Sequence, residues 1–266
     1  MNITCDHINY HGSFAEYRCI KTRVFANQTK ADFAILNAAD PEQEEMDRII
    51  NAQVIKFSSK RVLRKGIFIK KNHMILRMPG ANEEQYPLSI INLPGLHNAE
   101  NVMAAVMAAR LCGCSQENII AAVAAFRGLP HRIEFVGEKN SIKFYDDSKG
   151  TNVGSVVRAL ETFARPVILL LGGRDKDGDF ETLKPLLAAK AKKVILFGEA
   201  RNRIASLIGQ DMPALKKAKL REAIERAYKN AKTDDVILLS PGCASFDEFA
   251  NYKERGNFFK DVVRNL

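Results

Sequence analysis

The sequence has no tryptophan and no apolar run near the roughly 18 residues that a membrane-spanning helix requires. Its first residues, MNITCDHINYHGSF, have neither the basic start nor the apolar stretch of a secretory signal. The cytoplasm is therefore the expected compartment. With aromatic residues at only 8%, the chain is also poorly supplied with the stacking platforms that bind single-stranded nucleic acids.

Two glycine-rich phosphate motifs are missing. None of the 16 glycines is followed by a lysine, so the GxxxxGK[ST] loop, which cradles nucleotide phosphates, is absent. The segment GGRDK at 172–176 has adjacent glycines rather than the spaced glycines of a dinucleotide fingerprint. Hydride transfer with a dinucleotide therefore gains little support.

The five cysteines are odd in number and scattered, and a single residue separates Cys112 from Cys114, where a zinc knuckle has two. Reduced, structural thiols are predicted. Cys243 in SPGCAS is a possible nucleophile, but no histidine is near it in sequence, which favours a structural thiol. Ser245 is then a helix N-cap or a hydrogen-bond donor to substrate.

The net charge of +9 is spread along the chain and is not accompanied by an aromatic-basic recognition motif. Nucleic acid and small anionic substrates remain open as explanations, although the composition favours the second. The length of 266 residues, with 46% hydrophobic and 27% charged residues, predicts a folded chain of two domains.

The first half of the chain mixes helices and short strands. Helical spacing over 16–27 places Tyr17, Ile20 and Val24 on one apolar stripe, with Phe25 as a possible fourth member. Similar spacing of Val102, Ala105, Val106 and Ala109 predicts a long helix that stops at Gly113. The other predicted elements are strands within 31–40 and 54–59, helices at 41–50 and 117–126, and an antiparallel strand pair around a turn at 71–72. The domain boundary is placed after residue 129.

The second half is more regular. Apolar strands are predicted at 142–145, 167–171, 194–197 and 236–239, and they alternate with helices at 151–163, near 183, near 204, at 220–231 and at the end of the chain. Such alternation predicts a parallel sheet covered by helices on both faces. Ligands bind at the carboxyl ends of the strands in sheets of this kind.

Three polar loops follow these strands: DDSKGTN at 146–152, GGRDK at 172–176 and SPGCAS at 240–245. The first leads into a helix, so backbone amides near Thr151 and the ammonium of Lys149 can hold a phosphate or a carboxylate. Alternatively, Ser148 or Thr151 simply caps the helix and Lys149 is solvated. The other two loops, expected at the same edge of the sheet, favour the anion site.

His7 and His11 lie four residues apart, but a zinc site would need further ligands, and nearby Asn9 and Gly12 make a regular helix doubtful. Taken alone, they are ordinary polar residues of a loop.

Six segments, taken together and in this order, resemble the successive signatures of the Mur ligases, and they cover the chain from end to end. They are NITCDHINYHGSFAEYRCIKTRVF, GLHNAENVMAA, GLPHRIEFV, FYDDSKGTNVGS, LLLGGRDKDGDF and LLSPGCASFDEFANYKERGNFF. The DDSKGTN loop and the last segment are similar to those of the D-glutamate-adding members in particular.

The resemblance implies an α/β fold: an incomplete Mur-ligase central ATPase domain at 1–129, followed by a Rossmann-like, doubly wound C-terminal domain at 130–266. It also implies an ATP-dependent ligase of peptidoglycan precursor synthesis, which joins D-glutamate to UDP-N-acetylmuramoyl-L-alanine through an acyl phosphate. ATP and Mg²⁺ are the implied cofactors.

The resemblance further implies roles for individual residues. His7 and Lys21, the latter as a carbamate, hold magnesium, and together with Lys149 they form the catalytic set. The implied nucleotide contacts are Asn98, Asn101, His131, Arg132 and Asp147. The implied D-glutamate contacts are Thr151, Lys176, Ser245, Phe246 and Tyr252.

The missing phosphate loop and nucleotide-sugar domain predict that this chain alone is inactive as a ligase. Two alternatives remain: a non-catalytic module that binds a nucleotide or D-glutamate, and one half of a split ligase that works with a separate N-terminal half. Neither nucleic acid nor a membrane is an expected partner.

Overall fold

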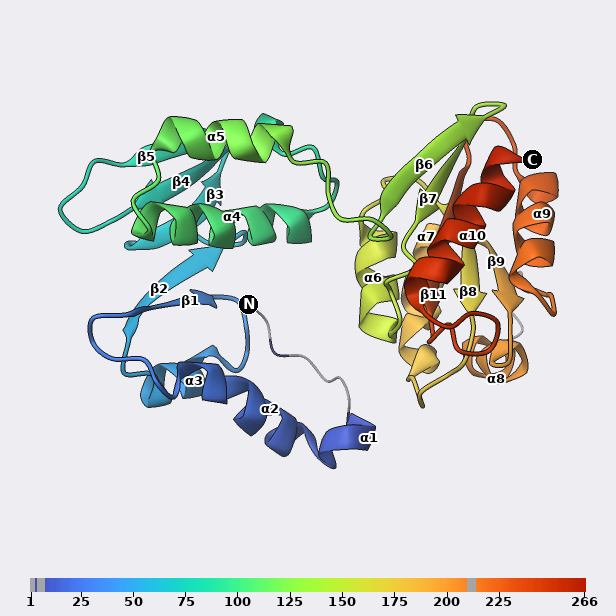
Figure 1. The fold of residues 1–266 in the computed structure, drawn as a ribbon, viewed down its shortest axis with the longest axis horizontal. Helices are drawn as coiled ribbons and strands as arrows, with labels where there is room; N and C mark the ends of the chain where they lie inside the picture. Colours follow the sequence, from blue (N-terminus) through green and yellow to red (C-terminus); the bar gives the residue numbers. More distant parts are fainter. Residues whose placement is uncertain (1–2, 4–7, 210–213) are drawn as a thin grey trace. The chain divides into compact units, whose positions relative to one another are not determined.

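The computed structural model describes residues 3, 8–209 and 214–266. The chain divides into two compact units, Met1–Arg127 and Gly128–Leu266 (Figure 1). This division lies two residues before the boundary placed from the sequence. None of the helices in the described ranges has the length and apolar composition that crossing a membrane requires.

Unit 1 is built on a five-stranded mixed sheet in the order β1-β2-β3-β4-β5. β1, β2 and β3 run parallel, whereas β3, β4 and β5 are antiparallel. The described elements are α1 (Ile8–His11), α2 (Phe14–Thr22), η1 (Arg23–Phe25), β1 (Phe33–Asn37), α3 (Gln43–Ile49), β2 (Gln53–Ser58), β3 (Gly66–Lys70), β4 (His73–Arg77), β5 (Glu84–Pro87), η2 (Leu88–Ile90), α4 (Leu96–Leu111) and α5 (Gln116–Ala125).

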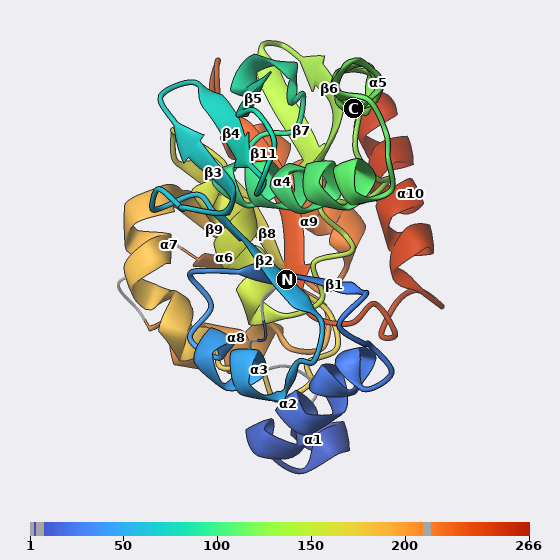
Figure 2. The same cartoon turned by 90° about the vertical axis from the view of Figure 1, so that its left-hand side faces the viewer.

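Helices α4 and α5 lie side by side over the sheet of unit 1 (Figures 1 and 2). Val102, Met103, Val106 and Met107 of α4 pack on strand residues such as Tyr86, which is fully buried. The antiparallel pair predicted around 71–72 is confirmed as β3 and β4, with Lys71 in the left-handed conformation that a tight turn requires (φ 53°). Strand β5 was not predicted.

Two of the predicted apolar stripes are wrong in detail. On α2 only Tyr17 is buried, while Ile20 is 46% and Val24 63% exposed. The helix also ends at Thr22 and continues as the 3₁₀ turn η1, which carries Val24 away from the face that Tyr17 occupies. On α4, Ala105 is exposed, because the helix turns Met103 and Met107 to the sheet instead.

Unit 2 has a six-stranded sheet in the order β10-β9-β8-β11-β7-β6. All neighbouring strands are parallel except β6, which is antiparallel to β7. The elements are β6 (Glu134–Lys139), β7 (Ile142–Asp146), α6 (Val153–Glu161), β8 (Val167–Gly172), η3 (Phe180–Leu183), α7 (Lys184–Lys190), β9 (Ala191–Phe197), α8 (Arg201–Ile208), β10 (Ala214–Lys216), α9 (Leu220–Asn230), β11 (Val236–Gly242) and α10 (Tyr252–Arg264).

Helices cover both faces of this sheet, which confirms the doubly wound architecture. Helices α6, α7 and α8 pack on one face, and α9 and α10 pack on the other (Figure 1). The four predicted strands, β7, β8, β9 and β11, are parallel as expected, and β6 adds an antiparallel edge strand. β6 escaped prediction because, as an edge strand, it has no residue with a fully buried side chain.

Helix α6 begins at Val153 and is capped by Asn152, whose Oδ1 accepts a hydrogen bond from the backbone N of Ser155 at 2.8 Å. The alternative that Ser148 or Thr151 serves only as the cap of this helix is therefore wrong. Ser148 instead hydrogen-bonds residues of α10, and Thr151 is left available for other contacts in the loop that follows β7.

Candidate functional site

The loops after β7, β8 and β11 meet at one edge of the sheet of unit 2, as the sequence predicted. β11 lies between β7 and β8 and runs parallel to both, so the carboxyl ends of the three strands are adjacent. The backbone N of Gly242 donates to the carbonyl of Gly150 at 2.9 Å. The backbones of Arg174 and Ala244 exchange two hydrogen bonds of 2.9 Å. The three loops therefore form one hydrogen-bonded assembly.

A buried arginine, which the sequence reasoning missed, connects two of these loops. Arg255 of α10 is fully buried. Its Nε and Nη2 donate to the hydroxyl and the carbonyl of Ser148 at 2.9 and 2.8 Å, and its Nη1 donates to the carbonyl of Cys243 at 3.1 Å. Because these acceptors are uncharged, burial dominates and lowers the pKa of Arg255 to about 10.

A signal for Arg255 was present in the sequence. It occupies the position four residues before Phe259 and seven before Val262, both of which are buried on α10. A cation on the apolar stripe of an amphipathic helix must find hydrogen-bond acceptors inside the protein. That spacing marks Arg255 as a residue with a specific role.

Asp147 directly follows β7 and is buried, with 4% of its surface exposed. Its Oδ2 accepts a hydrogen bond of 2.7 Å from the hydroxyl of Ser240 on β11, and its backbone N donates to the carbonyl of Leu239. Burial raises the pKa of the Asp147 carboxyl to about 7. The carboxyl can therefore exchange a proton near neutral pH.

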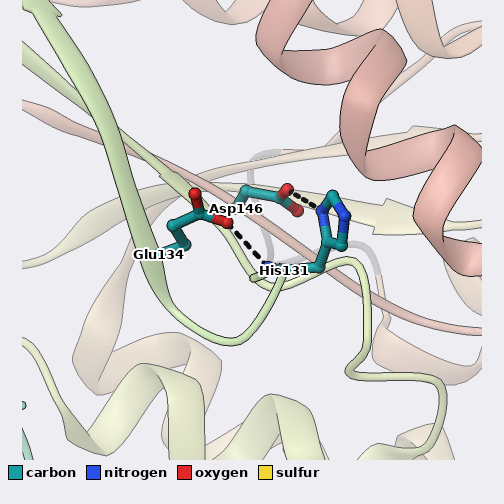
Figure 3. Close-up of side chains that lie close together, drawn as sticks. All are labelled: His131, Glu134 and Asp146. Carbon is teal, nitrogen blue, oxygen red and sulfur yellow. Dashed lines mark hydrogen bonds and ion pairs between the residues drawn. The ribbon is translucent and has the colours of Figure 1, made fainter. Parts of the chain in front are cut away.

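His131, Glu134 and Asp146 form a cluster beside it (Figure 3). Nδ1 of His131 lies 2.7 Å from Oδ2 of Asp146, and the backbone N of His131 donates to Oε2 of Glu134 at 2.7 Å. Burial also raises the pKa of Asp146. The His131 backbone is left-handed (φ 65°), as is that of Ile133 (φ 47°), so the turn is held in place by its hydrogen bonds rather than by local preference.

The donor atoms of this cluster, one imidazole and two carboxylates, are of the kind that bind divalent metals. Both carboxylates are already engaged, however. Glu134 forms a 2.6 Å ion pair with Lys260, and Oδ1 of Asp146 accepts from the backbone N of Ser148 at 2.8 Å. The cluster is built as a self-satisfied hydrogen-bond network, and we assign no metal to it.

The predicted cations of the loops are exposed. Lys149, Lys176 and Arg132 all reach solvent. Nζ of Lys149 lies 5.2 Å from the ring centroid of Tyr252. The backbone N of Lys149 donates to the carbonyl of His131 at 3.0 Å, so this loop and the His131 turn are directly joined. These three exposed side chains can offer positive charge to an anion at this edge of the sheet.

The remaining predicted contacts of unit 2 lie on the same loops. Ser245 is almost fully buried, and its carbonyl accepts from the backbone N of Phe249 at 2.9 Å. Because α10 is capped by Asn251, Ser245 is not its N-cap. Thr151 is half-buried, Phe246 is 57% exposed, and the carbonyl of Tyr252 accepts from the hydroxyl of Ser148 at 2.8 Å.

Cys243 does not have the environment of a nucleophile. Its side chain is buried, and that burial raises the pKa of its thiol to about 12. The thiolate is therefore scarce at neutral pH, which agrees with the structural role that the sequence favoured.

The predicted residues of unit 1 lie on α2 and α4. Lys21 is exposed, and its Nζ lies 5.3 Å from the ring centroid of Tyr17. Asn98 and Asn101 are in the first turns of α4: Nδ2 of Asn98 donates to the carbonyl of Pro94 at 2.7 Å, and Asn101 is exposed. His7 lies outside the described residues.

Comparisons with known proteins agree on one family. A family model described as "Mur ligase middle domain" matches residues 1–109, and one described as "Mur ligase, glutamate ligase domain" matches residues 131–243. A protein of Syntrophus aciditrophicus named UDP-N-acetylmuramoylalanine--D-glutamate ligase is 54% identical over 99% of this chain. A protein of the same name from Acidobacterium capsulatum is 43% identical over 99% of the chain. The chain spans 58% of the length of each of these two relatives.

Solved structures share the fold. MurF from Acinetobacter baumannii superposes with a TM-score of 0.71 at 17% identity, covering 99% of this chain and 58% of that one. MurF ligase from Thermotoga maritima, in complex with ADP, has a TM-score of 0.69 at 18% identity, covering 100% of this chain and 62% of that one. At these identities the likeness concerns the fold alone.

Proposed function

The chain belongs to the Mur ligase family, and from this premise we propose that it serves the ATP-dependent ligation of D-glutamate to UDP-N-acetylmuramoyl-L-alanine in peptidoglycan precursor synthesis. The observation that carries the proposal is the joined set of loops after β7, β8 and β11, which presents Lys149 and Lys176 at one sheet edge. The names of the relatives from Syntrophus and Acidobacterium support it. The cytoplasm, where such precursors are made, is the proposed location.

We assign residues 1–129 to the C-terminal part of the central, ATP-binding domain and residues 130–266 to the D-glutamate-binding domain. In the reaction, a carboxylate oxygen of UDP-N-acetylmuramoyl-L-alanine attacks the γ-phosphorus of ATP and ADP leaves. The amine of D-glutamate then attacks the acyl phosphate, loses a proton and expels inorganic phosphate as the amide forms. The protein's task is positioning and neutralisation of negative charge.

The D-glutamate site is proposed on the loops of unit 2. The substrate carries two carboxylates, which call for cations and hydrogen-bond donors. Lys176 and the hydroxyl groups of Thr151 and Ser245 supply these, while Phe246 and Tyr252 enclose the carbon chain. Lys149, held near the Tyr252 ring, is proposed to contact the anionic groups at the reacting centre.

Nucleotide contacts are proposed for residues of each unit taken separately. Asn98 and Asn101 would meet the adenine, and His131, Arg132 and Asp147 would hold the ribose and phosphates. The amide of Asn98 is already oriented by Pro94, and the ring of His131 by Asp146, so two of these groups are preorganised.

Magnesium is proposed at Lys21 and His7. Lys21 is exposed, so its amine is open to carbon dioxide, and the resulting carbamate is an oxygen ligand of the kind magnesium prefers. When bound, the ion would neutralise charge on the phosphate groups. The protein's own residues would hold it through the carbamate oxygen and the His7 imidazole.

The first test measures binding and turnover with the purified chain. We expect calorimetry to detect binding of ADP and binding of D-glutamate to the chain. We expect Lys176→Met to abolish the heat of D-glutamate binding. Lys184→Met is the matched control, since Lys184 is also a lysine of unit 2 with a solvent-accessible side chain but is paired with Glu181 of η3. A folded chain that binds neither ligand would contradict the proposal.

The second test is amide formation from ATP, UDP-N-acetylmuramoyl-L-alanine and D-glutamate. Because the sequence has no GxxxxGK[ST] loop, we expect no product from this chain alone. Product on addition of a separately expressed N-terminal piece would identify one half of a split ligase. Binding without product in that mixture would favour the alternative, a non-catalytic nucleotide- and D-glutamate-binding module.

A further inference from the structure

The imidazole of His131 is fixed on one side only. Nδ1 lies 2.7 Å from Oδ2 of Asp146 inside the protein, where Asp146 is fully buried and His131 is 6% exposed (Figure 3). No residue in the described part of the chain hydrogen-bonds the other ring nitrogen, Nε2. Nδ1 is therefore bound to the protein, and Nε2 is available to a ligand.

The surroundings of Asp146 decide which nitrogen carries the proton. Its second oxygen, Oδ1, accepts from the backbone N of Ser148 at 2.8 Å, and a backbone amide can only donate. When Asp146 is ionised, its carboxylate can only accept, so the ring donates from Nδ1 to Oδ2. A neutral imidazole that is protonated at Nδ1 has a lone pair at Nε2.

The ring is also held in place from outside the pair. The backbone carbonyl of His131 accepts from the backbone N of Lys149 at 3.0 Å, and the backbone N of His131 donates to Glu134. An ion pair with Lys260 joins Glu134 to α10. Gly256 of α10 packs directly on the pair: a Cβ built there would touch Nδ1 of His131 and lie 2.7 Å from Oδ2 of Asp146. A helix gives up about 1 kcal/mol when it has glycine instead of alanine in its interior. Only the absence of a side chain allows this close approach.

We propose that Asp146 is a positioning residue that holds His131 in the Nδ1–H tautomer, so that Nε2 accepts a hydrogen bond from a hydroxyl group of the nucleotide's ribose. The inference rests on the proposed function for the identity of the ligand. The tautomer itself is a property of the free protein. An Nε2 acceptor rejects a ligand that lacks the hydroxyl, because the nitrogen is then left unpaired.

Asp146→Asn is the informative change. The amide has one acceptor and one donor group, and the obligatory donor Ser148 N claims the acceptor. The NH₂ group then faces His131 and requires Nδ1 to accept, which moves the ring proton to Nε2. An Asp-to-Asn change beside a catalytic histidine produces the wrong tautomer in this way in serine proteases.

The test is ¹⁵N NMR of the imidazole rings of the full chain at about pH 8, in which only five histidines must be assigned. We expect a protonated Nδ1 and an unprotonated Nε2 for His131, and the reverse in Asp146→Asn. Asp261→Asn, which removes an exposed carboxylate of α10, is the control and should leave the His131 signals unchanged. An Nε2–H tautomer in the unaltered chain would overturn the inference. This result can be obtained from the unaltered protein alone, even if Asp146→Asn does not fold.

Binding of ADP, 2′-deoxyADP and 3′-deoxyADP provides the second readout. A lost neutral hydrogen bond corresponds to a loss of about three- to tenfold in affinity. We expect one deoxynucleotide to bind more weakly to the unaltered chain by this factor. Equal affinities for all three nucleotides in the unaltered chain would refute the ribose contact. Failure to bind any of them would refute the proposed nucleotide site, while the NMR result would still decide the role of Asp146.

Discussion

Three ionisable side chains of unit 2 are buried where β7 meets α10 and β11: Asp146, Asp147 and Arg255. Each has satisfied hydrogen bonds, yet the acceptors of Arg255 and the hydroxyl partner of Asp147 are uncharged. Buried charges with uncharged partners cost stability relative to the same groups in water. Such a cost is expected where a site must present charge to a ligand.

The pH dependence of stability should reveal Asp147. Its pKa rises from the ordinary 3.8 to about 7 on folding. Between these values the folded state binds a proton that the unfolded chain has released, so this group's contribution to the free energy of unfolding falls as pH rises from about 4 to about 7. We expect Asp147→Asn to become more stable relative to the unaltered chain by on the order of 2 kcal/mol across this window.

Urea unfolding followed by circular dichroism at several pH values measures this difference. Asp179→Asn serves as the control, because Asp179 is an exposed carboxylate in a loop of the same unit. Parallel pH profiles for Asp147→Asn and the unaltered chain would show that the carboxyl is ionised in the folded protein throughout the window.

Thiol reactivity should separate Cys243 from the exposed cysteines. Cys19, Cys112 and Cys114 are exposed, whereas the Cys243 thiol is buried and has a pKa of about 12. Iodoacetamide at neutral pH should therefore alkylate the first three in the native protein and Cys243 only after denaturation. Peptide mapping by mass spectrometry reads each site, and rapid native labelling of Cys243 would be inconsistent with the buried, structural thiol.

At the scale of elements, α10 organises the site. It supplies Arg255 to the loops after β7 and β11, and it brings Gly256 against the His131–Asp146 pair. Gly256 is therefore retained for close packing and not for flexibility. A substitution there should act on the turn at His131 as well as on the helix.

Two helical glycines provide a matched comparison. Gly256→Ala gains helix propensity but forces its Cβ into His131 and Asp146, so we expect a net loss of about 1–3 kcal/mol in the free energy of unfolding. Gly154→Ala in α6 meets only Oδ1 of Asn152 at 3.6 Å, an ordinary contact, and should be neutral or stabilising by up to about 1 kcal/mol. Chemical denaturation measures both, and equal effects would contradict the tight packing at Gly256.

Elements with strong periodicity were predictable from the sequence. The apolar strands β8, β9 and β11 and the periodic helices α4, α6 and α9 were predicted correctly, because burial imposes a repeating pattern of apolar residues. The strands β5, β6 and β10 were not predicted from the sequence. β6 and β10 have no fully buried side chain, and β5 is only four residues long. Val24 was misplaced because periodicity alone does not show where an α-helix tightens into a 3₁₀ turn.

The candidate site was partly predictable for a related reason. Loops at the ends of parallel strands follow from the topology, so 146–152, 172–176 and 240–245 could be grouped in advance. Asp146 and Glu134 act through contacts with His131 and Lys260, which no local pattern encodes. The spacing on α10 marks Arg255 as buried but does not identify its partners, Ser148 and Cys243. Their roles required the three-dimensional arrangement.

At the scale of the whole molecule, the two units have separate cores. Both hydrophobic clusters of unit 2 draw their buried residues only from 133–263, and the cluster of unit 1 draws its residues from 55–119. A unit with its own cores can fold independently. The chain can then be divided between Arg127 and Gly128 without removing residues from either set of cores.

We therefore expect residues 128–266, expressed alone, to fold cooperatively. Their ¹H–¹⁵N NMR spectrum should superpose on the corresponding signals of the full chain, apart from residues near position 128. Circular dichroism should show a single sigmoidal unfolding transition. A spectrum without dispersion would show that unit 2 depends on unit 1 for its structure.

The contacts of Arg255 have a consequence for the order of folding. The guanidinium of Arg255 and the loop at Ser148 are separated by 107 positions, and Ser240 and Asp147 by 93. Closing such long loops lowers the chain entropy before any contact can stabilise the closed loop. Strands that pair over short separations, such as β8 with β9, therefore form first with their nearest helices, and the ligand-binding edge is completed late. Weakening the Arg255 contacts would then mainly accelerate unfolding and leave the folding rate nearly unchanged.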